Sequence, residues 1–165
     1  MHTQHAFTIY NASAGSGKTY TLVKSYLRTL FLSKNPNKFR ELLAITFTNK
    51  AVGEMKSRIV ETLEAFSKYL PSDAESPTML SDLAKELNLP KEELAARSSR
   101  ILKTIIHNYA AFDIVTIDAL TSRVLRTFAR DLDLASNFEI SLDVTDLYAR
   151  AVHNLIEKAG SDKKL

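Results

Sequence analysis

The segment ASAGSGKT, at residues 12–19, combines small residues with a lysine and a threonine in a pattern that can bind phosphate. Small residues let successive backbone N–H groups converge on phosphate oxygens, as in the P-loop pattern G-x-x-x-x-G-K-S/T. Lys18 would neutralise the β- and γ-phosphates of a nucleoside triphosphate, and the Thr19 hydroxyl would coordinate Mg²⁺. We therefore predict an ATP and Mg²⁺ site, with Lys18 and Thr19 as its catalytic residues, formed by Ala12, Ser13, Ala14, Gly15, Ser16, Gly17, Lys18 and Thr19.

The loop departs from the usual pattern at one position, because Ala12 stands where the first glycine is expected. Several P-loop families accept alanine there, so Ala12 limits the number of P-loop families to which the chain can belong. The alternative is a glycine turn that joins a strand to a helix and leaves Lys18 solvated. The strand-loop-helix context and the Lys18–Thr19 pair favour the phosphate site over that turn.

A second segment, AITFTNKAVGEMKSRI at residues 44–59, places an aromatic residue where a strand ends and a helix begins. The ring of Phe47 suits an unpaired base, and Thr48 and Asn49 suit a backbone phosphate of single-stranded nucleic acid. The structural alternative puts Phe47 in the core and makes Thr48 or Asn49 a helix N-cap. In that alternative the basic residues are a solvated face, formed by Lys50, Lys56 and Arg58. The residues alone leave both interpretations open.

These segments belong to a pattern of buried strands alternating with helices, which is typical of an α/β domain with a parallel sheet. A third strand of this pattern ends in the sequence TIDAL, where Asp118 can cap the next helix. Three strands make a thin sheet, so the architecture looks unfinished. We predict strands at residues 7–11, 41–47 and 112–117 and an extended piece at 138–142. We predict helices from the loop to about Ser33, from Val52 to Leu70, after a cap at Ser81, after Pro90, after Asp118 and over 145–158.

Composition excludes several kinds of site. The chain has no cysteine, which removes disulfides and thiolate metal sites, and its four histidines are scattered. A net charge of +3 permits nucleic-acid binding without demanding it. No stretch approaches the roughly 20 apolar residues of a membrane span, and the first residues do not resemble a signal peptide. We expect a cytoplasmic protein without a membrane partner.

Three motifs in order, ASAGSGKT, AITFTNKAVGEMKSRI and TIDALTSRVLRTFARDL, resemble the first motifs of superfamily-1 DNA helicases of the UvrD and RecB type. Ala12 and the short lead-in before the loop look closest to the RecB and AddA nuclease-helicase branch. The resemblance extends to DLDLASNFEISLDVTDLYARAV, which is similar to the stretch entering the accessory domain of that family. It implies a RecA-like P-loop NTPase fold, an incomplete parallel sheet with flanking helices, and a mostly helical accessory segment at the C-terminal end.

The resemblance also implies a division of the chain. Residues 1–128 would be the first part of the ATP-binding motor domain, with a helical insertion at about 72–109. Residues 129–165 would be the truncated beginning of the accessory domain. The acidic Mg²⁺ pair, the arginine finger, the second motor domain and any nuclease domain would all lie beyond Leu165. Because phosphoryl transfer needs these groups, we expect this part alone to be nearly inactive.

As to function, the resemblance implies an ATP-driven motor that moves 3′ to 5′ on single-stranded DNA in repair of double-strand breaks. Its partners would be single-stranded DNA and a second nuclease-helicase subunit. The DNA contacts would be Phe47, Thr48, Asn49 and Thr116. Asp118 stands where the family usually has a histidine, and a carboxylate beside a phosphodiester is repelled, which puts direct contact by Asp118 in doubt.

Alternatives remain for the third motif and for the whole chain. Asp118 could be a Mg²⁺ ligand at a strand end, although Ala119 replaces the glutamate that helicases place beside it. Three arginines spaced by three and four residues, Arg123, Arg126 and Arg130, could follow a DNA backbone or form a solvated face. The whole chain could instead be a small P-loop kinase or a non-catalytic nucleotide- or DNA-binding module.

Overall fold

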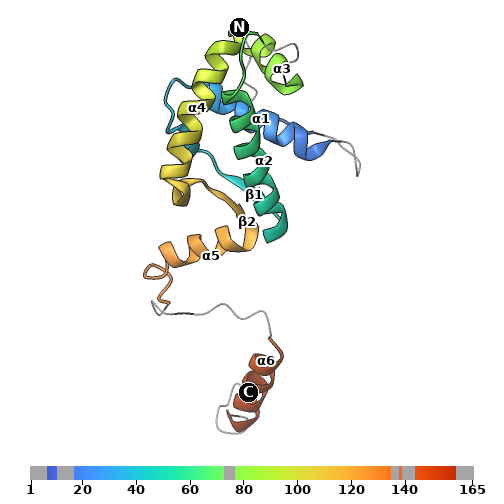
Figure 1. The fold of residues 1–165 in the computed structure, drawn as a ribbon. Helices are drawn as coiled ribbons and strands as arrows, with labels where there is room; N and C mark the ends of the chain where they lie inside the picture. Colours follow the sequence, from blue (N-terminus) through green and yellow to red (C-terminus); the bar gives the residue numbers. More distant parts are fainter. Residues whose placement is uncertain (1–6, 11–16, 73–76, 135–137, 139–143, 159–165) are drawn as a thin grey trace. The chain divides into compact units, whose positions relative to one another are not determined.

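The computed structural model describes residues 7–10, 17–72, 77–134, 138 and 144–158. The chain divides into two compact units, residues 1–120 and residues 121–165. The first unit contains four α-helices and two short strands among its described residues, and the boundary falls within helix α5 (Ile117–Thr127) (Figure 1). This boundary lies close to the predicted one after residue 128, whose assignment to motor and accessory domains stays a prediction.

Helix α1 (Lys18–Leu32) follows the glycine loop, and its length agrees with the prediction because Ser33 is its C-cap. An apolar stripe at helical spacing drives its packing. A turn at residues 36–37 and a short 3-10 helix, η1 (Lys38–Glu41), follow it. The residues that α1 buries are Val23, Tyr26, Leu27, Leu30 and Phe31.

Helix α2 (Asn49–Ser67) lies against α1 and against both strands. Its buried residues are spaced by three or four, as a helix with one core face requires: Met55, Ile59, Leu63 and Phe66. The apolar pattern predicts a helix as far as Leu70, but Leu70 lies beyond the end of α2 and is exposed. A single apolar residue at the right spacing does not extend a helix that has no further surface to bury.

Helices α3 (Thr78–Leu87) and α4 (Lys91–His107) come from the segment predicted as an insertion. Both contribute side chains to the core that α1 and α2 form, and α4 lies alongside α2 (Figure 1). Helix α4 begins after Pro90, as predicted. The predicted cap at Ser81 is wrong, because the Pro77 carbonyl already accepts a hydrogen bond from the Ser81 N–H and Ser81 lies inside α3. Proline is tolerated at a helix start, where its missing N–H costs nothing.

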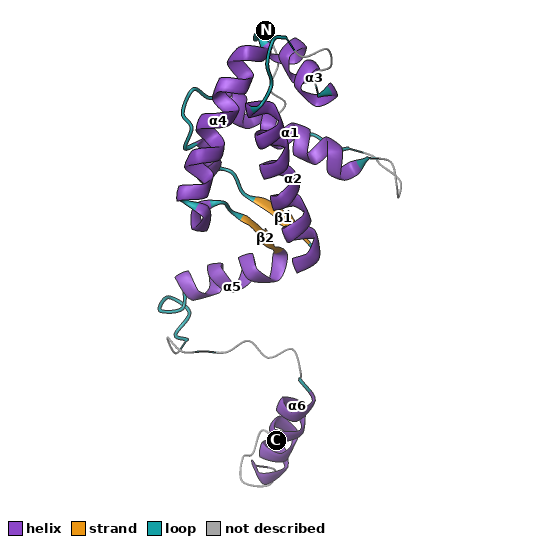
Figure 2. Cartoon of the chain, viewed as in Figure 1, coloured by secondary structure: helices purple, strands orange, loops and turns teal. Residues whose placement is uncertain are grey.

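Strands β1 (Ala44–Thr46) and β2 (Ile114–Thr116) form a parallel pair, in which Ala44 lies opposite Ile114 and Thr46 opposite Thr116 (Figure 2). The parallel sheet of the predicted fold is therefore confirmed. Both strands are shorter than predicted, because only three residues of each pair in register. Glu41 lies in η1 and Ile117 is the first residue of α5, while a second 3-10 helix, η2 (Tyr109–Ala111), precedes the predicted start of the third strand. The described part of the chain is mostly helical.

The strand predicted at residues 7–11 is wrong for the described residues 7–10, which have no regular structure. Phe7 and Ile9 are exposed, at 79% and 76%. A strand exists only through its ladder with a neighbour, and the described sheet consists of β1 and β2 alone. Asn11 lies outside the described residues, as do residues 139–143 of the predicted extended piece.

Helix α6 (Thr145–Lys158) has the predicted bounds, and all its side chains are exposed. It belongs to the second unit. None of the described helices is both long enough and apolar enough to cross a membrane.

Candidate nucleotide and nucleic-acid site

The described part of the phosphate loop is its end, where Gly17 precedes α1. Gly17 has φ 77° and ψ 21°, the left-handed conformation that favours glycine. A Cβ built on Gly17 would meet no atom within 4 Å, so the conformation rather than lack of space requires glycine here. The Gly17 carbonyl accepts the first helical hydrogen bond, from the Thr21 N–H at 3.0 Å. The other predicted loop residues lie outside the described residues: Ala12, Ser13, Ala14, Gly15 and Ser16.

The start of α1 has the character of an anion site. Its first turn contains no acidic residue, and Gly17 supplies no side chain to cap the helix. The N–H groups of a first helical turn have no partner within the helix, and the helix dipole is positive there. Lys18 is exposed and Thr19 half-buried, whereas α1 enters the core only from Val23 onward. Phosphate oxygens could therefore reach this end of the helix from solvent.

The second predicted motif spans the turn between β1 and α2. Phe47 has 86% of its surface exposed, so the alternative that placed it in the core is wrong. The other half of that alternative is confirmed, because the Thr48 hydroxyl caps α2 by accepting a hydrogen bond from the Ala51 N–H at 3.2 Å. Asn49 is the first residue of α2 and is exposed. The turn thus combines a structural cap with a solvent-facing aromatic ring.

The third motif begins where β2 ends. Thr116 is 8% exposed, and its hydroxyl accepts a hydrogen bond from the Ala119 N–H at 3.2 Å. Helix α5 starts at the next residue, Ile117, so Thr116 caps it. The predicted cap at Asp118 is wrong, because Asp118 is already the second residue of the helix. There its carboxylate lies near the positive end of the helix dipole.

Strand pairing brings the second and third motifs together. Thr46 and Thr116 are partners in the parallel register, so both strands end at one edge of the sheet. Phe47 and Thr48 follow one strand at that edge, and Asp118 follows the other. Ligands of parallel α/β sheets characteristically bind at the carboxyl ends of the strands. The arrangement can therefore present an aromatic face beside two helix N-termini.

The predicted arginine stripe is only partly helical. Arg123 and Arg126 lie in α5, but the helix ends at Thr127 and leaves Arg130 in the turn that follows. The guanidinium of Arg126 lies 5.6 Å from the centre of the Phe138 ring, within the range of a cation–π contact. Helical spacing alone therefore does not align all three arginines.

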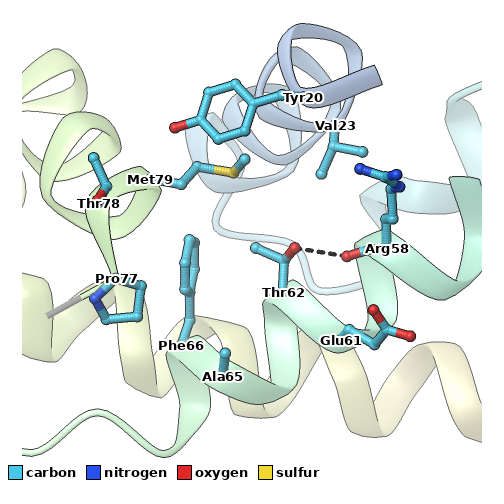
Figure 3. Close-up of a pocket in the computed structure, with 10 residues that line it drawn as sticks. All are labelled: Tyr20, Val23, Arg58, Glu61, Thr62, Ala65, Phe66, Pro77, Thr78 and Met79. Atoms are coloured by element: carbon cyan, nitrogen blue, oxygen red, sulfur yellow. Dashed lines mark hydrogen bonds between the residues drawn. The ribbon is translucent and has the colours of Figure 1, made fainter. Parts of the chain in front are cut away.

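A hollow of about 400 Å³ lies among α1, α2 and α3 (Figure 3). The side chains of Phe66 on α2 and Met79 on α3 point toward each other in its lining, and Arg58 and Glu61 line it from α2. None of the predicted site residues that the structure describes lines it. Its nearest approach to them along the chain is Tyr20, which directly follows the Lys18–Thr19 pair.

Comparison with known proteins identifies the family. The family model described as the UvrD/REP helicase N-terminal domain matches residues 2–165. The chain is 28% identical over 158 residues to an ATP-dependent helicase/nuclease subunit of Lysinibacillus sphaericus, and the match covers 94% of this chain and 12% of the relative. It is 31% identical over 157 residues to the RecB protein of the RecBCD enzyme of Haemophilus influenzae, and that match covers 87% of this chain and 12% of the relative.

A third relative is the corresponding ATP-dependent helicase/nuclease protein of Clostridium beijerinckii, 32% identical over 114 residues, which cover 69% of this chain and 9% of the relative. No solved structure matches the chain. The chain belongs to the UvrD/REP helicase family, and the resemblance to the RecB and AddA nuclease-helicase branch is confirmed. It spans 9–12% of the length of these relatives.

Proposed function

We propose that the chain is the ATP-binding N-terminal part of a DNA helicase motor. The observation that carries this proposal is the family match over residues 2–165. The complete protein would use ATP and Mg²⁺ to move 3′ to 5′ along single-stranded DNA in the repair and recombination of double-strand breaks. Relatives that are named as components of RecBCD and of a helicase/nuclease support a partnership with a second nuclease-helicase subunit. A cytoplasmic location is part of the same proposal.

This part of the protein would contain a phosphate-binding site and a separate DNA-binding site. Residues 12–19 would bind the phosphates, with Lys18 on the β- and γ-phosphates and Thr19 on Mg²⁺. The left-handed Gly17, which has no side chain to cap α1, supports this assignment. Phe47, Thr48, Asn49 and Thr116 would form the DNA side. The exposure of Phe47 supports a stacking role, whereas the Thr48 and Thr116 hydroxyls already cap helices.

The proposed domains follow from the family resemblance. Residues 1–128 would belong to the motor and residues 129–165 to an accessory domain. A phosphate loop without the acidic pair and arginine finger binds a nucleotide but hardly hydrolyses it, since catalysis of phosphoryl transfer depends on neutralising the developing charge. The 165-residue chain should therefore bind ATP with little turnover.

The test measures both ligands on the 165-residue chain. A non-hydrolysable ATP analogue with Mg²⁺ should raise the melting temperature, because a ligand that binds only the folded state at 100 times its Kd stabilises it by about 2.7 kcal/mol. Lys18→Ala should abolish the rise, and Lys103→Ala, which removes an exposed lysine of α4, should keep it. An unchanged melting temperature at saturating nucleotide would contradict the phosphate site.

The DNA side is measured by fluorescence anisotropy of a labelled single-stranded oligonucleotide over a salt series. Phe47→Ala should weaken binding without changing the salt slope, because stacking on one aromatic is worth about 1–3 kcal/mol and involves no counterion release. Tyr148→Ala, which removes another exposed aromatic, is the control. If the chain binds no better than an unrelated protein of equal charge, the helicase proposal fails and the P-loop kinase alternative gains.

A further inference from the structure

The turn between β1 and α2 is held by hydrogen bonds to both oxygens of Thr48. Its side-chain oxygen accepts from the Ala51 N–H at 3.2 Å, and its carbonyl accepts from the Val52 N–H at 3.0 Å. The same carbonyl accepts a second hydrogen bond, from the Thr46 hydroxyl at 3.2 Å. Thr48 is therefore fixed on one side by the helix it caps and on the other by the last residue of the strand.

Phe47 lies between these two fixed residues. Its ring is 86% exposed, but its backbone is bounded by Thr46 in the strand ladder and by Thr48 at the helix cap. Ordering a flexible segment on binding costs free energy, and a segment already held in its bound form avoids that cost. The Thr46–Thr48 hydrogen bond thus restricts the backbone that carries the exposed ring.

The neighbouring strand end shows that a cap does not require such a bond. Thr116, the register partner of Thr46, caps α5 directly, and the helix begins at the following residue. After β1 the cap comes two residues later, at Thr48, which leaves Phe47 in the connection between strand and helix. The two strand ends therefore differ in that Phe47 lies in a connection outside the helix, and the Thr46 hydroxyl forms a hydrogen bond across this connection.

We infer that Thr46 is a positioning residue for single-stranded DNA, because its hydroxyl holds the turn in the form that presents Phe47. This inference rests on the proposed function and extends it to Thr46, which is not one of the predicted DNA contacts. Thr46 is half-buried beside Ala44 and acts through Phe47 rather than by touching DNA. The signal in the sequence is the Thr46-Phe47-Thr48 order, which allows one hydroxyl to bond the carbonyl two residues on.

The test compares Thr46→Val, which keeps the β-branched shape but removes the donor, with Thr46→Ser, which keeps the hydroxyl. Thr46→Val should weaken binding of a labelled single-stranded oligonucleotide by roughly two- to tenfold, the equivalent of one hydrogen bond. Thr46→Ser should bind close to wild type. The matched control is Thr104→Val, which removes a hydroxyl that donates to the Arg100 carbonyl on α4, and it should not change DNA affinity.

Two further readouts separate positioning from a general loss of stability. In a Phe47→Ala background, Thr46→Val should have no further effect on DNA affinity, because no ring remains to be positioned. Hydrogen exchange of the amides at residues 47–52 should be faster in Thr46→Val without DNA.

The outcomes distinguish a failure of the proposed DNA-binding function from a failure of the positioning role of Thr46. If wild type binds DNA and Phe47→Ala weakens it, but Thr46→Val does not, the inference alone is wrong. An equal loss from Thr46→Val in both backgrounds also overturns it. If the wild-type chain does not bind single-stranded DNA, the proposed function fails, and the inference fails with it.

Discussion

Two glycines with equally open surroundings should respond to alanine in opposite directions. A Cβ at Gly17 or at Gly53 would meet no atom within 4 Å. Gly17, however, has φ 77°, and the left-handed conformation costs a non-glycine residue roughly 1–2 kcal/mol. Restricting the unfolded chain returns about 0.4–1 kcal/mol, so Gly17→Ala should lower the free energy of unfolding by about 1 kcal/mol.

Gly53 lies inside α2 and is exposed, where glycine is less favourable than alanine by roughly 0.5–1 kcal/mol. Gly53→Ala should therefore raise the free energy of unfolding. Urea denaturation should separate the two variants by about 1.5–2 kcal/mol with unchanged m-values. If both substitutions change the free energy of unfolding in the same direction, the left-handed conformation of Gly17 does not determine how the chain responds to alanine at this position.

Three more substitutions test side chains of α1 and α4. The Tyr26 hydroxyl is buried without a hydrogen-bond partner among the described residues, so Tyr26→Phe should stabilise the chain by about 1 kcal/mol in urea denaturation at pH 7. Burial, with a smaller contribution from the Asp113 charge, raises the Tyr26 pKa above its ordinary 10.0. Above pH 10 the tyrosine therefore ionises in the unfolded chain before it ionises in the folded chain, which lowers the free energy of unfolding. Tyr26→Phe should remove this decrease at high pH. Arg97 donates a hydrogen bond of 2.6 Å to the Phe31 carbonyl at the end of α1, and Arg97→Met should cost about 2 kcal/mol. Glu93→Gln, which removes only the carboxylate paired with Arg97 along α4, should cost about 0.5 kcal/mol or less by the same assay, and an equal cost would refute the role of the Phe31 contact.

Apolar spacing predicts the helices well, because the periodicity of burial is a local property of the sequence. It places α1 to within a residue of Ser33 and gives the bounds of α6. Helix starts are harder, since several residues nearby can cap. Ser81 and Asp118 are good caps by type, but α3 already begins after Pro77 and α5 begins directly after Thr116.

Strands, unlike helices, depend on residues that are distant in the sequence. Residues 7–11 have the composition of a strand, yet residues 7–10 form none, because pairing with a neighbour is decided by distant parts of the chain. Similarly, β1 and β2 are limited to the three residues of each that pair in register. For the site, the sequence predicts which residue types gather after the strands, and the pairing of Thr46 with Thr116 brings them to one edge.

Phe47 and Thr48 explain why the second motif supported two interpretations. The sequence allows either a DNA contact by Phe47 and Thr48 or a structural role for both, and it treats these as alternatives. In the structure Thr48 is the cap, and the ring beside it is exposed, so each residue satisfies one interpretation. The cap holds Thr48, the residue after Phe47, at the start of α2. The hydroxyl of Thr46, the residue before Phe47, donates a hydrogen bond to the Thr48 carbonyl and so links the two neighbours of Phe47. A solvent-exposed ring can serve as a defined stacking surface only where its backbone is held, so the structural role of Thr48 is a condition for the proposed role of Phe47.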